Sequence, residues 1–518
     1  MKLADIFQDG AVLQRGKESK IWGEDPNGTH VKAVLKGKTS VIAETSVQNG
    51  KFMLTFPAME AQKDVLLKLV NDRDEVICLK DLAVGEVWIA GGQSNMEFRM
   101  AWDAERDNIL SEYENTMIRF YETPKISYEG ALEEENHSTE GVWRKAVPDE
   151  IPYFSAVGFY FANKLQKEFE GVPMGIIGCN WGGTSVSCWM PEEDLVSEFQ
   201  VYIDLKDKTR GMDLEKEFET FKKRRADELS PEQCERLDLL MKNPIVEPQP
   251  PMNPTPEMEA FMALKYAPFS AFSAGNLYQT MLKKIVPYTC AGVIWYQGEE
   301  DSLPEYGGKY DRLFAKMIER WRMDWQEELP FIFAQLAGFT NPGGKLSLNF
   351  TQVRADQELA SKAVKDAWMA VTYDVGLQYD IHPKQKRPVG ERMALQALHH
   401  VYGKEQLSES PDVTAVRKEE GLITLEMIHT GDGLCLAGED EKVKGLSAAS
   451  ENYGNFFAQN CFPAAPGVVL IQSGLAVAGY DVTLSSIASA SIFVMIISII
   501  LTMVQVFLFD RQVKGGKK

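Results

Sequence analysis

Four short stretches of the sequence carry polar residues and glycines of kinds that do chemistry in proteins. They are GGQSNMEF (91–98), NWGGTS (180–185), YQGEED (296–301) and YDIHPKQKRPVGER (379–392). Together they supply a serine, a histidine, carboxylates, an amide and paired glycines: Ser94, His382, Glu299, Asp380, Gln297, Gly182 and Gly183. Nucleophilic acyl transfer needs a serine, a histidine that takes its proton and a carboxylate that stabilises the imidazolium. It also needs hydrogen-bond donors aimed at the developing oxyanion. These residue types predict a serine hydrolase.

Each residue also has a purely structural interpretation, as a helix cap, a turn or a solvated loop carboxylate. Position favours the chemical interpretation. The first three stretches each follow an apolar, strand-like run: GEVWIA (85–90), MGIIGCN (174–180) and AGVIWY (291–296). Since open α/β sheets place their chemistry outside the carboxyl ends of the strands, we expect these residues to meet at one edge of a sheet.

The elements that must hold this site alternate between strand and helix from about residue 83. Two more strand-like runs follow at 330–336 and 367–374, with amphipathic helical stretches between the runs. This alternation predicts an α/β domain over 83–405, a parallel sheet with helices on both faces. Residues 1–82 carry short strand-like runs separated by turn signals, which predicts a small β-sandwich.

Two regions depart from this rhythm. Residues 200–260 are rich in charge and then in proline, typical of an insertion that either borders a cleft or forms a linker. Residues 406–450 return to strand-like runs and are interpreted as a remnant of an accessory β region.

The net charge of −20 argues against nucleic acid and anionic lipid as partners of the folded part. Seven scattered cysteines show no CxxC pair and no metal-ligand spacing, so we expect a reduced protein without a bound metal. The N-terminus has no apolar run long enough for a signal peptide, which predicts a cytoplasmic location. The sequence does not indicate an oligomeric state.

In chain order, GEVWIAGGQSNMEF, IIGCNWGGTSVSCWM, GVIWYQGEED and IHPKQKRPVGERMA resemble the sialate O-acetylesterase family. That family belongs to the SGNH hydrolase superfamily and lies close to acetylxylan-type carbohydrate esterases. The early stretch FQDGAVLQRGKESKIWGEDPNG resembles the β-domain that precedes the core in these proteins, so the resemblance covers about residues 1–445. It implies an SGNH-like sheet, hydrolysis of acetyl esters on sugar hydroxyls through an acyl-enzyme, and no cofactor.

The resemblance also implies roles for single residues. Ser94 would be the nucleophile and His382 the general base, for which we expect a pKa near or somewhat below seven. The backbone N–H groups of Ser94 and Gly183 and the side chain of Gln297 would form the oxyanion hole.

The acid is less well defined by the resemblance. The superfamily pattern has an aspartate three residues before the histidine, where this chain has Tyr379. Glu299 of the QGE stretch is therefore the first candidate for the acid, and Asp380, two residues before His382, is the second.

A binding protein with the same fold is the rival hypothesis. Trp181, Trp189 and Trp295 would then serve as sugar platforms. As substrate-binding residues we predict Trp181, Trp295 and Arg354. Arg99, Arg354 and Arg387 are all candidate partners for a sugar carboxylate. Whether the sugar is sialic acid, xylose or another stays open.

The uncharged stretch 487–509 stands apart from the rest. At ~1.5 Å per residue it would reach roughly 35 Å, enough to span a hydrocarbon core. The basic residues that follow it would put the esterase outside the cell, which conflicts with the missing signal peptide. The end of the chain looks like the last span of a sugar-transporter permease. We therefore interpret it as a fusion or a gene-assembly error, with a tail-anchored esterase as the alternative. Membrane contact is expected only through this stretch.

Overall fold

A computed structural model gives the fold, and it describes residues 1–131, 140–226, 231–248, 256–340, 349–419 and 422–431. Residues Met1–His429 form one compact unit and Thr430–Lys518 a second. The membrane span predicted at 487–509 lies outside the described ranges. Among the helices within those ranges, none combines the length and apolarity that a membrane crossing requires.

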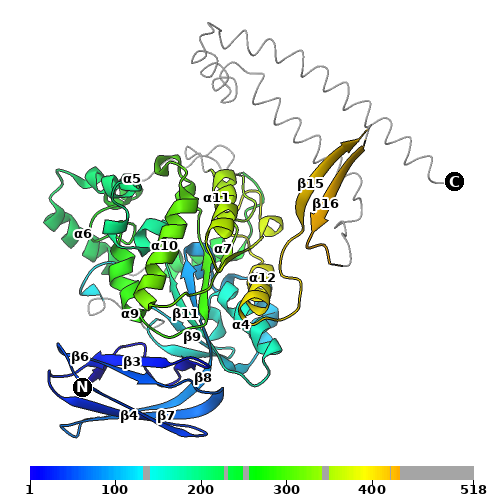
Figure 1. Cartoon of the computed structure of the whole chain (residues 1–518). Helices are drawn as coiled ribbons and strands as arrows, with labels where there is room; N and C mark the ends of the chain where they lie inside the picture. The colour runs from blue at the N-terminus through cyan, green and yellow to red at the C-terminus, as the bar shows by residue number, and fades with distance from the viewer. Residues whose placement is uncertain (132–139, 227–230, 249–255, 341–348, 420–421, 432–518) are drawn as a thin grey trace. The chain divides into compact units, whose positions relative to one another are not determined.

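The N-terminal region has two antiparallel layers, drawn in dark blue in Figure 1, of which the second is continuous with the central sheet. One sheet contains β1 (Lys2–Leu3), β3 (Ser19–Glu24) and β6 (Lys51–Phe56). The other pairs β4 (His30–Lys36) with β5 (Ser40–Ser46) and with β7 (Gln62–Asn71). Exposed and buried residues alternate along β6, so Phe52, Leu54 and Phe56 point to one side and are buried. This alternation is what a two-layer β structure requires.

A single long strand, β8 (Val76–Gly92), joins this region to the central sheet. Its first part pairs antiparallel with β7, and its residues Glu86–Gly92 pair in parallel with β11 (Met174–Asn180). The short strand β2 (Val12–Gln14) pairs in parallel with β8 at Ala83–Gly85. The domain boundary predicted at residues 82 and 83 thus falls inside one continuous strand.

The central sheet has the order β10-β9-β11-β8-β12-β13-β14. Its pairings are parallel except at one edge, where β10 (Trp143–Ala146) runs antiparallel to β9 (Asn115–Glu122). The remaining strands are β12 (Gly292–Tyr296), β13 (Phe331–Ala334) and β14 (Ala367–Ala370). The five strands predicted from apolar runs are present, whereas β9 and β10 were missed because their sequences are not continuously apolar.

Helices cover the central sheet on both sides. In Figure 1 its strands run between α10 (Tyr310–Trp325), which connects β12 to β13, on one side and α4 (Ala156–Glu168) with α12 (Arg387–Gln396) on the other. Helices α4 and α12 contact each other. Since β11, β12 and β13 are buried throughout, both faces are covered.

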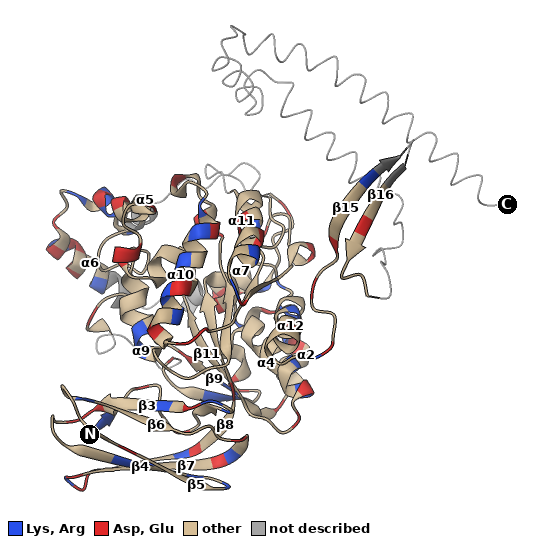
Figure 2. Cartoon of the chain, in the orientation of Figure 1, with Lys and Arg blue, Asp and Glu red and all other residues tan. Residues whose placement is uncertain are grey.

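The charged insertion contains helices and contacts the rest of the α/β domain. It contains α5 (Gln200–Asp204), α6 (Leu214–Ala226), α7 (Pro231–Lys242) and α8 (Pro256–Leu264). Acidic and basic residues are interspersed along α6 and α10 (Figure 2). The Ile245 N–H donates to Asp380 Oδ2 at 3.1 Å, and the Trp102 indole N–H donates to Asp238 at 2.9 Å. The insertion therefore borders the segment that carries His382.

A two-stranded antiparallel hairpin follows the core, formed by β15 (Asp412–Glu419) and β16 (Leu422–Ile428). It lies within the accessory β region predicted at 406–450, of which residues 420–421 and 432–450 are outside the described residues. Helix α11 (Phe350–Ala363) packs beside α10 and precedes β14.

Candidate active site

The serine stretch begins where β8 ends, and two glycines allow that ending. Gly92 has φ +135°, and a Cβ there would lie 2.2 Å from the Tyr296 carbonyl oxygen on β12. A Cβ on Gly91 would lie 2.7 Å from the Trp295 ring. Only glycine permits this approach of neighbouring strands together with the turn that follows. Ser94 then starts the short helix α1 (Ser94–Glu97) just outside the strand.

Ser94 and His382 meet at the carboxyl end of the sheet. His382 lies in the bend after β14, and its Nε2 is 2.9 Å from Ser94 Oγ. For the hydroxyl to donate to Nε2, the neutral ring must carry its proton on Nδ1. No described residue offers an acceptor to Nδ1 at hydrogen-bond distance. The structure thus places side by side the two residues that the sequence analysis expected to meet.

The electrostatic environment keeps His382 neutral. Burial and the nearby ammonium groups of Lys386 and Lys384 lower the pKa of His382 to about 4, against an opposing effect of Asp380 and Glu97. This is lower than the value near seven expected from the sequence. The difference arises because burial and two close cations, none visible in the sequence, all disfavour the imidazolium.

Asp380 holds the backbone around His382. Its Oδ1 accepts from the His382 backbone N–H at 2.9 Å, and its Oδ2 accepts from the Ile245 N–H. Oδ2 also forms an ion pair with Lys384 at 3.0 Å, and both side chains are buried. An aspartate only two residues before the histidine could reach the imidazole if the chain turned between them. The carboxylate of Asp380 instead accepts from backbone N–H groups.

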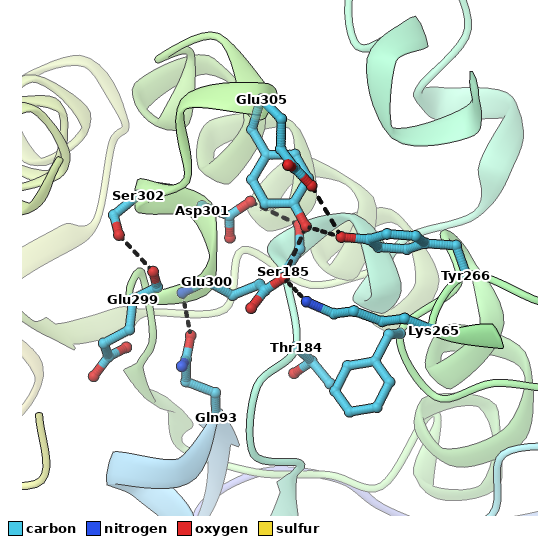
Figure 3. Close-up of polar contacts among 12 residues, drawn as sticks. Gln93, Thr184, Ser185, Lys265, Tyr266, Glu299, Glu300, Asp301, Ser302 and Glu305 are labelled. Carbon is cyan, nitrogen blue, oxygen red and sulfur yellow. Dashed lines mark hydrogen bonds and ion pairs between the residues drawn. The ribbon is translucent and has the colours of Figure 1, made fainter. Parts of the chain in front are cut away.

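Glu299 has a different partner from the one expected of a triad acid. Its side chain is buried, Oε1 accepts from the Asn95 side-chain amide, and Oε2 has no hydrogen-bond partner in the described structure. In Figure 3 it points away from Glu300 and Asp301, which face Lys265 and Ser185. Burial raises the pKa of Glu299.

The glycine loop that contains the predicted oxyanion donor Gly183 lies beside the serine. A Cβ on Gly182 would lie 3.3 Å from Ser94 Cβ, so the glycine loop passes directly over the nucleophile. Glu97 Oε2 accepts from the Gly182 N–H at 2.8 Å, which fixes the loop. Gly183 has φ +72°, a left-handed conformation that favours glycine. Neither the Ser94 nor the Gly183 N–H donates to another described residue, so both can donate to a bound oxyanion.

Gln297 is engaged away from the site. It is fully buried, and its Nε2 donates to the Thr184 carbonyl at 3.0 Å and to Asp301 Oδ2 at 2.5 Å. Tyr310 donates to its Oε1 at 3.0 Å. Its side chain thus fastens the loop after Gly183 to Asp301, and no amide hydrogen is left for an oxyanion.

The three predicted substrate-binding residues lie in different environments. Trp181 is half-buried next to the glycines, with Lys125 Nζ 6.0 Å from its ring centroid. Trp295 is fully buried against Trp189 and other rings, so it is a core residue and not a sugar platform. Arg354, on α11, lies over the Tyr373 ring at 5.0 Å and contacts neither Ser94 nor His382.

Sequence reasoning missed three buried polar residues of the site: Asn95, Lys386 and Asp301. Asp301 accepts from Ser185 Oγ at 2.7 Å, the Val186 N–H at 3.0 Å and the Tyr202 hydroxyl at 2.8 Å. All three lie inside the stretches already singled out. Nothing in the sequence marks these polar side chains as buried, and only the packing shows it. Within the described ranges no group of three or more His, Cys, Asp or Glu side chains is arranged to hold a metal ion.

Comparison with known proteins identifies the family. A family model described as "Carbohydrate esterase, sialic acid-specific acetylesterase" matches residues 84–212 and 264–399, just over half of the chain. The gap between the two matched segments falls in the charged insertion. A second model, described as a protein of unknown function (DUF969), matches residues 433–514, outside the described structure.

Individual relatives agree with the first model. The sialate O-acetylesterase of Mus musculus is 22% identical over 445 residues, covering 79% of this chain and 74% of its own length. The Homo sapiens enzyme is 22% identical over 491 residues, covering 87% and 80%. A solved structure of a carbohydrate acetylesterase from Xanthomonas citri superposes with a TM-score of 0.61 at 26% identity, covering 82% of this chain and 81% of that one.

These matches run through the strand ends that carry Ser94, Gly183, Glu299 and His382, and they confirm the resemblance read from the four stretches. The chain belongs to the carbohydrate esterase family of sialic acid-specific acetylesterases and is a carboxylic ester hydrolase.

Proposed function

We propose that this protein is a serine carbohydrate O-acetylesterase that removes acetyl groups from sugar hydroxyls through an acyl-enzyme on Ser94. The observation that carries the proposal is the 2.9 Å contact between Ser94 Oγ and His382 Nε2 at the carboxyl end of the sheet. That geometry is the reach a general base needs to take the hydroxyl proton.

The first half of the reaction forms the acyl-enzyme. His382 Nε2 takes the Ser94 proton while Oγ attacks the acetyl carbonyl carbon. The resulting oxyanion accepts from the N–H groups of Ser94 and Gly183, which have no other acceptor among the described residues. The imidazolium then protonates the sugar oxygen as the ester bond breaks, so the leaving group departs as a neutral alcohol.

In the second half, His382 takes a proton from a water molecule as the water attacks the acetyl-serine carbonyl. The imidazolium then returns a proton to Ser94 Oγ as the acyl bond breaks, and the acetyl group leaves as acetic acid. Asp380 supports the charged intermediate at a distance, since its carboxylate raises the pKa of His382 while holding the backbone at that residue. Gln297 has no direct role in this proposal because its amide is fully engaged.

Sialic acid is the sugar named by the family and by the curated relatives, and we propose a 9-O-acetylated sialic acid as substrate. An acetylated xylan is the alternative, since the wider group includes esterases of both kinds. Rates on acetylated sialic acid, xylan oligomers and acetylated glucosamine, measured side by side, decide between them. A preference of at least tenfold for one substrate assigns it.

The serine mechanism is tested by Ser94→Ala, His382→Ala and the double variant. Each single change should remove nearly all hydrolysis of a chromogenic acetate ester, by several orders of magnitude in turnover, while leaving the melting temperature close to that of the wild type. The double variant should be little worse than either single one because the two residues act as a unit. A serine-directed phosphonate should label the wild type and not Ser94→Ala.

More than a tenth of wild-type turnover in Ser94→Ala would reject Ser94 as the nucleophile. Wild-type protein that binds sugars but neither hydrolyses acetate esters nor reacts with the phosphonate would favour the rival, a binding protein with the same fold.

A further inference from the structure

The side chain of Asn95, the residue after the proposed nucleophile, sits between two buried charges. Its Nδ2 donates to Glu299 Oε1, and its Oδ1 accepts from Lys386 Nζ at 2.5 Å. All three residues are buried, with exposed fractions of 1% for Asn95, 3% for Glu299 and 0% for Lys386. We call Glu299, Asn95 and Lys386 the amide bridge.

The two charges fix which way the amide faces. An ammonium group can only donate and an ionised carboxylate can only accept, so Oδ1 must face Lys386 and Nδ2 must face Glu299. The amide dipole then lies along the line from cation to anion and is favourable at both ends. Flipping Asn95 would oppose donor to donor and acceptor to acceptor.

The second hydrogen of Asn95 Nδ2 binds the backbone next to His382. It donates to the Ile381 carbonyl at 3.0 Å, and that carbonyl belongs to the peptide unit that ends at the His382 nitrogen. The N–H of the same peptide donates to Asp380 Oδ1 at 2.9 Å. One side chain therefore connects the backbone of the serine stretch to the backbone of the histidine segment.

The surroundings explain how Lys386 stays buried. Its Nζ lies 4.5 Å from the Phe98 ring centroid and 5.6 Å from that of Tyr296, so two aromatic faces contact the cation. Its backbone N–H donates to Asp103 at 2.9 Å, immediately before α12 begins. Burial lowers the pKa of Lys386 to about 7, while the charge of Glu299 opposes that fall. The lysine and the glutamate thus depend on one another.

We propose that the amide bridge positions Ser94 against His382, with Glu299 and Lys386 as positioning residues that act through Asn95. This inference rests on the proposed roles of Ser94 and His382. It gives Glu299 a function that does not require contact with the imidazole.

The test compares Glu299→Gln, Lys386→Met and the charge-neutral double variant. Each single change leaves one buried charge without its counterpart, so Asn95 should turn or shift and the reacting pair should separate. A misplacement of about 1 Å costs on the order of a hundredfold in turnover, so kcat should fall by about that factor with KM within about threefold of wild type. The double variant removes both charges and should recover kcat about tenfold over the worse single variant.

The rate at which a serine-directed phosphonate labels each variant should follow kcat, because both depend on the Ser94–His382 contact. Arg320→Met and Asp194→Asn form the matched control. They break a partly buried ion pair between α10 and the turn at 192–194 that touches no residue of the site. These controls should lower the melting temperature and leave kcat unchanged.

Losses that multiply in the double variant would overturn the bridge and give the two residues independent roles. Single variants with kcat within threefold of wild type would also overturn it. If a single variant fails to fold, Asn95→Asp carries the test, since it keeps the side-chain volume but removes the donor, and unchanged kcat would again reject the bridge. An active Ser94→Ala would instead remove the proposed function itself, so the two failures are distinguishable.

Discussion

At the residue scale, the pKa of the His382 imidazole depends strongly on the groups around it. Burial and the charges of Lys386 and Lys384 lower its pKa to about 4, so the neutral, proton-accepting form prevails above about pH 5. We therefore expect protonation of the ring to lower kcat only below about pH 5.5. Loss of the Lys386 proton, whose pKa is lowered to about 7, should lower kcat toward the alkaline end instead.

A pH-stat measurement on an acetate ester between pH 3.5 and 8.5 checks this profile, with uncatalysed hydrolysis subtracted at each pH. A decrease of kcat toward acid pH with its midpoint between pH 6 and 7 would contradict it. The same lowered pKa affects folding. Because the unfolded chain binds the proton from about pH 6.5 downward, the free energy of unfolding should decrease as the pH falls from 6.5 toward 4.

The two candidate acids should differ in which property they change. Asp380→Asn leaves the buried Lys384 without its counter-charge and should cost about 3 to 5 kcal/mol of stability. Glu299→Gln should lower turnover more, because Asn95 links that carboxylate to both the serine and the histidine segments. Chemical denaturation and kcat measured on both variants separate the effects. A larger loss of kcat in Asp380→Asn at unchanged stability would reverse the assignment.

At the scale of elements, the ending of β8 decides whether the serine can be presented at all. Gly92 combines a positive φ with a backbone contact that leaves no room for a Cβ. Gly92→Ala should therefore cost about 2 to 5 kcal/mol, from strain and from displacement of β12.

Gly28→Ala is the matched control, since Gly28 has φ +84° but no atom within 4 Å of an added Cβ. It should cost only about 1 to 2 kcal/mol, the strain alone. Urea denaturation of the two variants gives the comparison. Equal losses would show that the close approach of β8 and β12 relaxes easily.

At the scale of the whole molecule, every described contact of the site comes from residues before His429. The esterase family model ends at residue 399, and a different model matches 433–514. We expect a chain ending at His429 to keep kcat within about twofold and to melt at nearly the temperature of the full chain, because it keeps every site contact among the described residues.

Purified protein of both lengths, compared by esterase assay and thermal unfolding in the same detergent-containing buffer, checks this expectation. A tenfold loss of kcat in the shorter chain would show that residues after 429 support the site. Sequencing the genomic locus across the codons for residues 440–480 tests the fusion separately, since an uninterrupted frame would contradict a gene-assembly error.

The sequence by itself determined the parts that depend on local pattern. Continuous apolar runs predicted β8, β11, β12, β13 and β14, since strands covered on both faces have no polar alternation. Glycines and polar residues at the ends of three such runs, with the histidine stretch that follows the last, predicted which residues meet. The four ordered stretches were also sufficient to indicate the family.

Only the tertiary structure decided what depends on burial and on contacts between distant segments. It shows that Trp295 is buried in the core and that the Gln297 amide donates to Asp301. It also shows that Glu299 accepts from Asn95 and makes no hydrogen bond with His382. It also placed Lys386 inside the protein and lowered the pKa of His382. The physical reason is that the residue type determines which bonds a side chain can make. Its burial and its bonding partners depend on chain segments up to some three hundred residues away.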